Sequence, residues 1–139
     1  MKTLLRILER AGGFRPTLYL KIENPPYMAL VVEAAPEPGP LNLPSISVAH
    51  YGEQNGDLMR DPEMCFELSK PPLCGLGLSS FYFRNDYLGV EQYSRYRDRE
   101  NYVVLPGLYE QHEQFARQWD KNLRAQAFLE AFTDQSIRG

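Results

Sequence analysis

The stretch Thr17–Ala34, TLYLKIENPPYMALVVEA, decides the fold. In Thr17–Glu23, leucine and isoleucine alternate with tyrosine, lysine and glutamate, which is the pattern of a strand with one buried face. Met28–Ala34 is almost continuously apolar, as expected of a strand inside a sheet. Two prolines in the segment Asn24–Tyr27 mark a turn between these runs. The stretch therefore predicts a β-hairpin.

More strands are expected beyond this hairpin. Pro36–Leu43 first interrupts the chain as a surface loop, because proline fixes φ and lacks a backbone donor. The β-like runs that follow are separated by turn signals, and a polar loop, Gly52–Glu63, joins the first two. These runs are Ser45–Tyr51, Met64–Leu68, Ser79–Arg84 and Tyr87–Tyr93.

Helices bracket the strands. We expect a short helix over Lys2–Ala11 and a longer one that begins at Pro106 and ends near Phe132, because apolar residues recur there at three- and four-residue spacing. The tail, residues 134–139, should fray. The side chains expected to face the sheet are Phe115, Trp119 and Leu123. The order predicts the α+β class: an antiparallel sheet of five to six strands with a short N-terminal and a long C-terminal helix.

Length and composition narrow the function classes. The 139 residues fit a single domain, residues 1–139. The formal net charge of −3 argues against nonspecific nucleic-acid binding, which relies on many lysines and arginines. Without a secretory signal or an apolar run of about 20 residues, we expect a cytoplasmic protein with no membrane partner. An exposed sheet edge would permit a symmetric dimer.

One local basic patch is expected in the last third of the chain. Arg95, Arg97 and Arg99 are interleaved with tyrosines in a segment that we expect to be exposed. Because arginine and tyrosine together stack on bases, single-stranded nucleic acid bound through these arginines is a minor alternative. A solvated turn or strand edge is the simpler interpretation, since Asp98 and Glu100 dilute the charge.

The segment with the most functional groups is His50–Glu63, HYGEQNGDLMRDPE. Asn55-Gly56 is the strongest short signal for a two-residue type I′ turn. With that turn, His50 lies opposite Asp61. The residues that strand alternation then places on one face are His50, Asp57, Asp61 and Glu63. An imidazole among carboxylates is suited to bind a divalent metal or to act as a base.

Two features of the same segment weaken this arrangement. Pro62 has no N–H to donate, so strand pairing should break or bulge beside it. A slip of one residue would move His50 to the opposite face from Asp61. A polar, turn-rich loop is therefore the plainest interpretation, and we assign no cofactor, metal or catalytic residue. The enzymatic alternative would use His50 and Asp61 as catalytic residues.

Other reactive side chains have structural interpretations. His112 lies on the apolar face of the last helix, where we expect it in the core or at its boundary. Cys65 lies in an apolar strand and is expected to be an inert core residue. Cys74 has no basic neighbour in sequence to stabilise a thiolate. Both thiols should be reduced in the cytoplasm.

The string HYGEQNGDLMRDPEM at His50–Met64, followed by Asn85–Gly89, resembles a family of small uncharacterised bacterial proteins. The resemblance covers about Pro26 to Gln92. Genes of that family are typical of plasmids, integrative elements and phages. The resemblance implies an accessory protein of a mobile genetic element, and it implies no catalytic residues.

Two functional hypotheses follow. The first is a non-enzymatic accessory protein of a mobile element that binds a protein partner and modulates host defence or element machinery. Its binding residues are Tyr51, Glu53, Asp57, Asp61, Glu63 and Tyr87. The acidic residues among them would steer association with a basic partner. The alternative is a small metal-assisted hydrolase whose metal ligands are His50, Asp57, Asp61 and Glu63.

Overall fold

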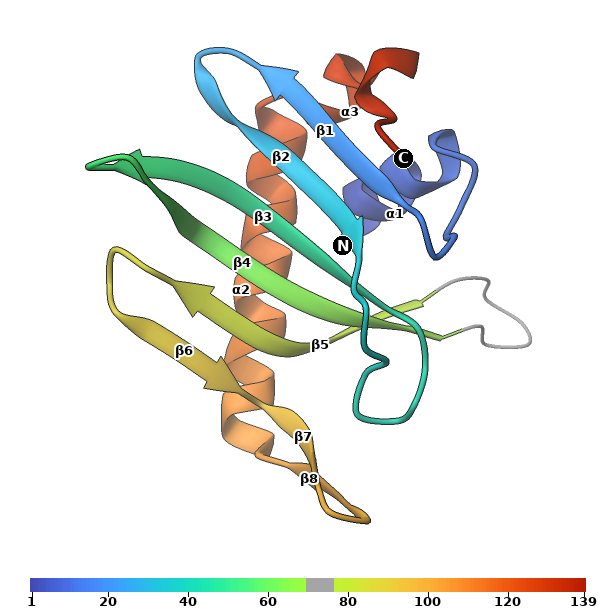
Figure 1. Ribbon diagram of the computed structural model, residues 1–139, viewed down its shortest axis with the longest axis vertical. Coiled ribbons are helices and arrows are strands. Elements are labelled where there is room, and N and C mark those ends of the chain that lie inside the picture. The colour runs from blue at the N-terminus through green and yellow to red at the C-terminus, as the bar shows by residue number, and fades with distance from the viewer. Residues whose placement is uncertain (70–76) are drawn as a thin grey trace.

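The computed structural model describes residues 1–69 and 77–139 and shows an antiparallel six-stranded sheet with its helices on one side (Figure 1). The strands neighbour one another in chain order, as β1 (Tyr19–Asn24), β2 (Tyr27–Ala34), β3 (Ser45–Gln54), β4 (Asp57–Ser69), β5 (Gly77–Asn85) and β6 (Val90–Tyr93). The helices are α1 (Lys2–Arg10), α2 (Pro106–Ala125), α3 (Phe128–Ala131) and the short 3-10 helix η1 (Asp134–Ser136). The predicted α+β architecture is confirmed.

A separate two-stranded ribbon connects the large sheet to α2. It consists of β7 (Arg95–Asp98) and β8 (Asn101–Val104). Figure 1 shows this ribbon beyond β6, next to the start of α2. The sequence predicts a charged turn or strand edge at Arg95–Arg99, but it does not predict that this run pairs with Asn101–Val104.

The inner face of the sheet, which faces the helices, forms the core. The alternate residues of β1–β4 that are almost completely buried are Leu20, Ile22, Leu30, Val32, Ile46, Val48, Met64 and Phe66. The helices cover them with Leu4, Ile7, Leu8, Trp119, Leu123 and Phe128. Each such side chain contributes about 1.5–3 kcal/mol by leaving water. This packing is what makes a helix as short as α1 stable.

Two of the three side chains expected to face the sheet are buried. Trp119 is 5% exposed and Leu123 is completely buried. Phe115 remains 40% exposed, although its ring meets Phe83 of β5 edge-on, with centroids 5.0 Å apart. Phe115 therefore lies at the margin of the core.

One hydrogen bond between polar side chains crosses this core. Trp119 Nε1 donates to His50 Nε2 at 3.1 Å. Because Nε2 accepts, Nδ1 carries the ring proton and donates to the carbonyl oxygen of Ala29 at 3.2 Å. Burial lowers the pKa of His50, since the charged form would lose its hydration. His50 is therefore a neutral core residue that joins β2, β3 and α2.

The prediction of a loop at Gly52–Glu63 is wrong, because β3 and β4 extend through this segment as one long hairpin. Gln54 pairs with Asp57 around the Asn55-Gly56 turn, as the type I′ turn predicts. The register then shifts by one residue in a bulge beside Pro62, and Ala49, not Val48, pairs with Glu63. The bulge is predicted by the missing N–H of proline.

The end of the chain differs from the prediction in two respects. The long helix ends at Ala125 instead of Phe132, because Ala127 adopts a left-handed conformation with φ of 61°. Residues 134–139 do not fray. Ile137 forms a bridge with Leu20, and the Arg138 N–H donates to the carbonyl oxygen of Tyr19 at 2.8 Å. The tail thus covers the edge of β1.

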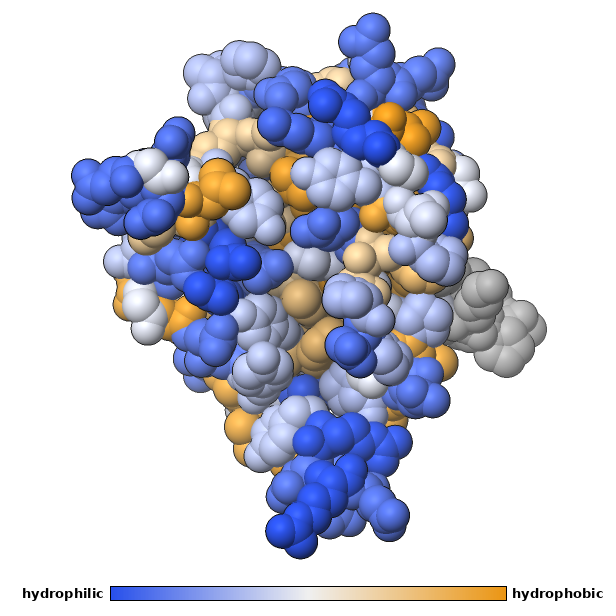
Figure 2. All heavy atoms as spheres, viewed as in Figure 1, coloured by the Kyte–Doolittle hydropathy of each residue, from blue (hydrophilic) through white to orange (hydrophobic). Residues whose placement is uncertain are grey.

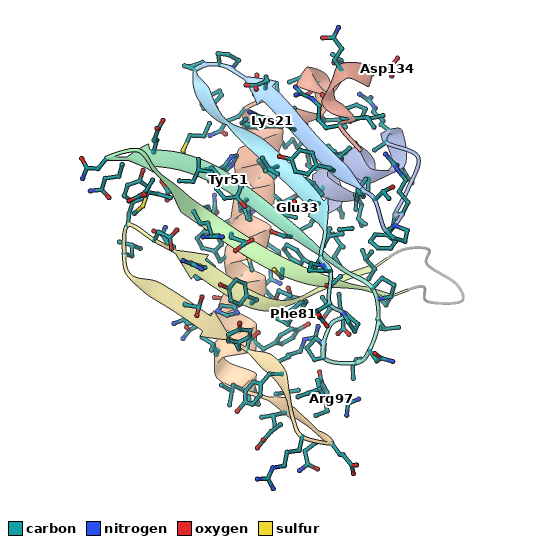
Figure 3. The ribbon with its side chains drawn as sticks, in the orientation of Figure 1. Lys21, Glu33, Tyr51, Phe81, Arg97 and Asp134 are labelled. Atoms are coloured by element: carbon teal, nitrogen blue, oxygen red, sulfur yellow. The ribbon has the colours of Figure 1, made fainter. Side chains whose placement is uncertain are left out.

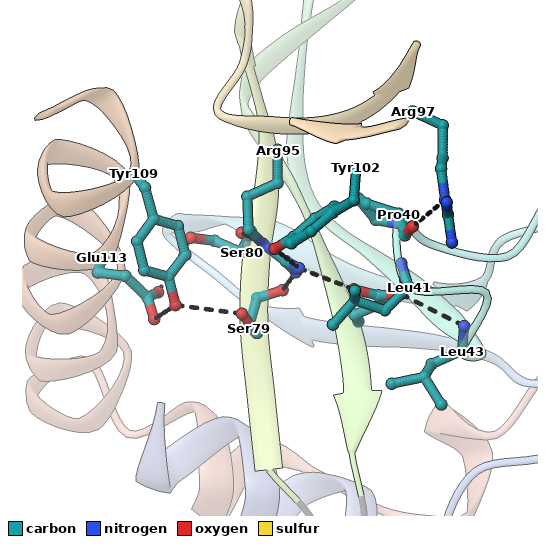
Figure 4. A network of polar contacts seen from close by, with 11 residues as sticks. Pro40, Leu41, Leu43, Ser79, Ser80, Arg95, Arg97, Tyr102, Tyr109 and Glu113 are labelled. Carbon is teal, nitrogen blue, oxygen red and sulfur yellow. Dashed lines mark hydrogen bonds and ion pairs between the residues drawn. The ribbon is translucent and has the colours of Figure 1, made fainter. Parts of the chain in front are cut away.

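A buried ion pair connects the loop Pro36–Leu43 and the β7–β8 ribbon to the sheet (Figure 4). Arg95 Nη1 lies 2.9 Å from Glu67 Oε1, and the two residues are 3% and 1% exposed. Glu67 Oε2 accepts the backbone N–H of Leu41 at 2.6 Å. A β-carbon at Gly39 would overlap the Glu67 side chain, so the loop can approach this closely only with glycine there.

The guanidinium of Arg95 is held on every side. It donates to the carbonyl oxygens of Ser79 and Ser80, each at 3.0 Å, and to the hydroxyl of Tyr102 at 3.1 Å. Charge-assisted bonds of this kind offset the cost of removing both ions from water. Arg95 therefore has a structural role, and the prediction that it is exposed is wrong.

We expect Glu67→Gln to lower the free energy of unfolding by about 3 kcal/mol, because Arg95 would remain buried without a counter-charge. Denaturant unfolding measures this loss. Glu37→Gln, an exposed glutamate in the same loop, is the control and should change stability by less than about 0.5 kcal/mol. Equal stability of the two variants would contradict the role of the ion pair.

The stability of the protein should fall as the pH is lowered from 7 to 5.5. The pKa of His50 is lowered in the folded state, so the unfolded chain takes up the proton first and acid favours unfolding. His112, whose pKa burial also lowers, adds to the effect. One such histidine contributes a slope of at most about 1.4 kcal/mol per pH unit.

Unfolding free energies at several pH values test this dependence. His50→Gln should show a shallower slope than the wild type, and His112→Gln serves as the matched variant. A slope for His50→Gln that equals the wild-type slope would show that His50 titrates normally in the folded protein.

Candidate functional site

The face of the sheet opposite the core, called the open face here, is the main candidate for a functional surface. Figure 1 shows α2 behind the sheet, and Figure 2 looks onto the open face from the same side. Within residues 1–69 and 77–139, no helix lies over it. In Figure 2, apolar atoms at its centre are surrounded by hydrophilic side chains.

Strand register aligns the side chains of the open face in rows, because paired residues share a face. One row, from β1 to β6, is Tyr19, Glu33, Ser47, Cys65, Tyr82 and Tyr93. The next is Lys21, Val31, Ala49, Glu63, Arg84 and Glu91. The smaller side chains lie at Ser47 and Cys65 in the first row and at Val31 and Ala49 in the second, and tyrosine or charged side chains occupy the other positions.

A hollow of about 460 Å³ lies over the first four strands of this face. The apolar side chains of Ala29 and Val31 line it. Larger side chains around it are Tyr19, Lys21, Glu33, Tyr51, Leu58 and Arg60. Figure 3 shows that Lys21, Glu33 and Tyr51 come from three neighbouring strands, β1, β2 and β3. The hollow therefore combines an apolar base with aromatic and charged walls.

Most charged side chains of the open face are paired. Arg60 Nε lies 3.2 Å from a Glu63 carboxylate oxygen. Arg84 Nε donates to Asp86 Oδ1 at 2.7 Å, and this bond together with the Arg60 N–H lowers the pKa of Asp86. Lys21 Nζ lies 3.4 Å from Glu23. The arginines and the lysine thus already have acidic neighbours.

Glu33 is the exception among the charged residues that line the hollow. It has no ion pair in the part of the chain that the structure describes. Partial burial and the nearby Glu63 carboxylate raise the pKa of Glu33, although Arg60 acts in the opposite direction. The negative charge of Glu33 is therefore poorly compensated, and a cation brought into the hollow would stabilise it.

Cys65 lies beside this hollow but is chemically quiet. Burial raises the pKa of its thiol to about 12, with a further contribution from Glu63. The thiol is protonated at neutral pH, which agrees with the expected inertness. The expectation that Cys65 belongs to the core is wrong, because its strand position places it on the open face, where it is partly exposed. Cys74 lies outside the described residues.

The four candidate metal ligands are not brought together. His50 points into the core, where both ring nitrogens are hydrogen-bonded, while Glu63 lies on the open face. The expectation that these two share a face is wrong, because the bulge beside Pro62 shifts the register.

The two aspartates have separate places. Asp57 is exposed next to the hairpin turn, and Asp61 accepts a hydrogen bond from Asn85 Nδ2 at 3.0 Å. Over residues 1–69 and 77–139, no three His, Cys, Asp or Glu side chains are grouped closely enough to hold a metal ion. The geometry thus gives the hydrolase alternative no metal centre.

The six candidate binding residues are divided between two places. Tyr51, Glu53 and Glu63 lie on the open face, since Glu53 pairs with Leu58 beside the hollow. The other three are Asp57, Asp61 and Tyr87, which lie at the β3–β4 and β5–β6 hairpins. The Tyr87 ring occupies the space that a β-carbon at Gly52 would need, so the two hairpins touch.

The basic patch expected at Arg95–Arg99 loses one of its three arginines, because Arg95 is buried against Glu67. Arg97 and Arg99 are exposed. Arg97 donates to the carbonyl oxygens of Pro40 and Glu100 at 2.8 and 3.0 Å, and Arg99 lies in the turn between β7 and β8. The nucleic-acid alternative therefore keeps two exposed arginines, one of which is already bonded to backbone carbonyls.

His112 is a core residue, as predicted. It is 3% exposed, its ring stacks on Phe83 with centroids 5.6 Å apart, and Nε2 lies 3.0 Å from Gln92 Oε1.

In the described ranges, no helix has both the length and the apolar character to cross a membrane.

The sequence interpretation missed Lys21 and Glu33. Lys21 stands at a polar position of the alternating run Thr17–Glu23, and Glu33 is the one charged residue of the apolar run Met28–Ala34, so the sequence does contain a signal for both. This signal predicts that Lys21 and Glu33 are accessible to solvent, but it does not predict that they lie near Tyr51. That proximity depends on the order β1-β2-β3.

Comparison with known proteins identifies one relationship. A family described as a domain of unknown function, DUF6908, has a model that matches residues 2–129. No curated protein and no solved structure matches the chain. Because the match spans α1 to α3 and the whole sheet, the chain belongs to the DUF6908 family.

Proposed function

We propose that the protein is a non-enzymatic binding module that holds a basic segment of a protein partner against its open face. The observation that carries this proposal is the hollow of about 460 Å³ with the Glu33 carboxylate at its side, which has no ion pair among the described residues. A sheet face with no cover, an apolar centre and a polar margin resembles the core and rim of an interface.

The aromatic side chains support contact with a protein. Tyr19 is 37% and Tyr93 is 50% exposed, and both stand at the ends of one row. Tyrosine is enriched at interfaces because a large ring and a polar hydroxyl are ordered at low entropic cost. Tyr19 and Tyr51 flank the hollow, where their ring faces would also attract a lysine or arginine of the partner.

Charge on the open face favours a basic partner. Acidic side chains outnumber basic ones there. The acidic residues are Glu23, Glu33, Glu53, Glu63, Asp86 and Glu91, and the basic residues are Lys21, Arg60 and Arg84. A net negative face accelerates the approach of a positive partner and rejects acidic ones. In this proposal Tyr51, Glu53 and Glu63 contact the partner, while Asp57, Asp61 and Tyr87 border the interface.

The biological setting is part of the proposal. The resemblance of HYGEQNGDLMRDPEM to mobile-element proteins supports an accessory protein of such an element that acts on host defence or element machinery. A cytoplasmic location fits Cys65, which forms no disulfide within residues 1–69 and 77–139. The hydrolase alternative has no comparable support, because His50 is committed to Trp119 and Ala29.

Charge reversal at the hollow tests the proposal. Wild-type protein, Glu33→Lys and Glu37→Lys are each immobilised, and proteins retained from a bacterial host lysate are quantified. Glu33→Lys should lose the basic partner at least tenfold, because the carboxylate at the hollow becomes a repelling cation. Glu37→Lys makes the same change of charge on an exposed loop residue and should retain the partner.

Folding of each variant is checked by its melting temperature. Equal retention by Glu33→Lys and the wild type, at equal stability, would contradict binding at the hollow. The double variant Asp57→Lys/Asp61→Lys tests the hairpin separately. If it alone abolishes binding, the interface lies at the hairpins and not at the hollow.

A further inference from the structure

A second surface, on the helix side of the molecule, carries the opposite charge. A cleft of about 600 Å³ is bordered by α1, α2 and the segment around α3. We call it the basic cleft, because five basic side chains line it: Lys2, Arg6, Arg117, Lys121 and Arg124. They come from two helices that are more than a hundred residues apart in sequence, and all five are exposed.

The helical spacing of these residues explains why they converge. Lys2 and Arg6 are four residues apart on α1, and Arg117, Lys121 and Arg124 follow at four and three on α2. Such positions form one stripe on a helix. The carboxylate of Asp120 accepts the backbone N–H groups of Thr3 and Leu4 at 3.2 and 3.3 Å, which ties the beginning of α1 to α2. The two basic stripes therefore border one cleft.

The cations of the basic cleft lack counter-charges. Within residues 1–69 and 77–139, none of the five takes part in an ion pair. Residues 70–76 contain no acidic side chain. Of the two acidic residues that line the cleft, Asp120 already accepts the two N–H groups of α1, and only Glu130 remains.

This arrangement is unfavourable in the free protein. Like charges three or four residues apart destabilise a helix by a few tenths of a kcal/mol per pair. A concave surface with an excess of charges of one sign, here five basic side chains against Asp120 and Glu130, also concentrates the potential and attracts counter-ions. The positive potential is local, since the whole chain has a net charge of −3. A bound anion with several charges would relieve the repulsion.

The lining narrows the chemistry of that anion. Lysine and arginine are the side chains that bind phosphate, arginine through two parallel hydrogen bonds. The lining contains no aromatic residue, so it offers no platform on which a nucleic-acid base would stack. A volume of about 600 Å³ lies in the range of small-molecule sites. We propose that the basic cleft binds a small anion that carries several phosphate groups.

Titration calorimetry with inorganic tripolyphosphate tests this proposal on the full chain at about 0.15 M salt. Lys121→Glu should weaken binding at least tenfold. Arg99→Glu is the matched control: it makes the same change of charge at an exposed arginine on the β7–β8 ribbon, outside the cleft, and should alter the dissociation constant less than twofold. Arg117→Gln provides a second cleft variant with a smaller change of charge. Orthophosphate should bind more weakly than tripolyphosphate, because it has fewer charges.

Several results would overturn the proposal. One is an absence of tripolyphosphate binding to the wild type, and another is equal weakening by Lys121→Glu and Arg99→Glu, which would indicate nonspecific attraction. A single-stranded oligonucleotide that binds more tightly than tripolyphosphate, and loses binding in Lys121→Glu, would assign the cleft to nucleic acid instead. These results are independent of partner capture at Glu33, since the cleft and the open face lie on different elements.

Discussion

The packing of α2 against one face of the sheet is the contact on which the rest of the structure depends. Trp119 and Leu123 fill the space above the inner residues of β3 and β4, and the Trp119 indole bonds to His50. Because this one-sided burial satisfies the core, the other face of the sheet is left with polar rows and small residues. The same helix turns its basic stripe away from the sheet, where α1 meets it. Both proposed sites are thus consequences of how α2 divides the molecule.

The bulge beside Pro62 has a comparable influence on chemistry. Without the shift it introduces, strand alternation would place His50 and Glu63 on one face. With it, His50 enters the core as a neutral hydrogen-bonding residue and Glu63 pairs with Arg60 on the open face. One proline therefore separates an imidazole from a carboxylate and removes the geometry that a metal-assisted reaction would need.

Local patterns of sequence account for most of the fold. Alternation in Thr17–Glu23, the apolar run Met28–Ala34 and the prolines between them predict the first hairpin, and Asn55-Gly56 predicts the turn of the second. The loop prediction for Gly52–Glu63 fails because most of these residues are polar, so the segment lacks the apolar alternation that signals a strand. The end of α2 fails for a different reason, since the left-handed conformation of Ala127 has no glycine or asparagine to signal it.

The candidate sites depend on tertiary contacts that such patterns do not contain. Arg95 looks like an exposed arginine in a charged run, and only the approach of Glu67 from another strand explains its burial. Net charge misleads in a related way, because it is a sum over surfaces. The acidic side chains of the open face outweigh the five cations on the helices in the total. A chain of net charge −3 therefore still presents one positive cleft. Composition describes the average field, whereas recognition depends on how the fold separates its charges.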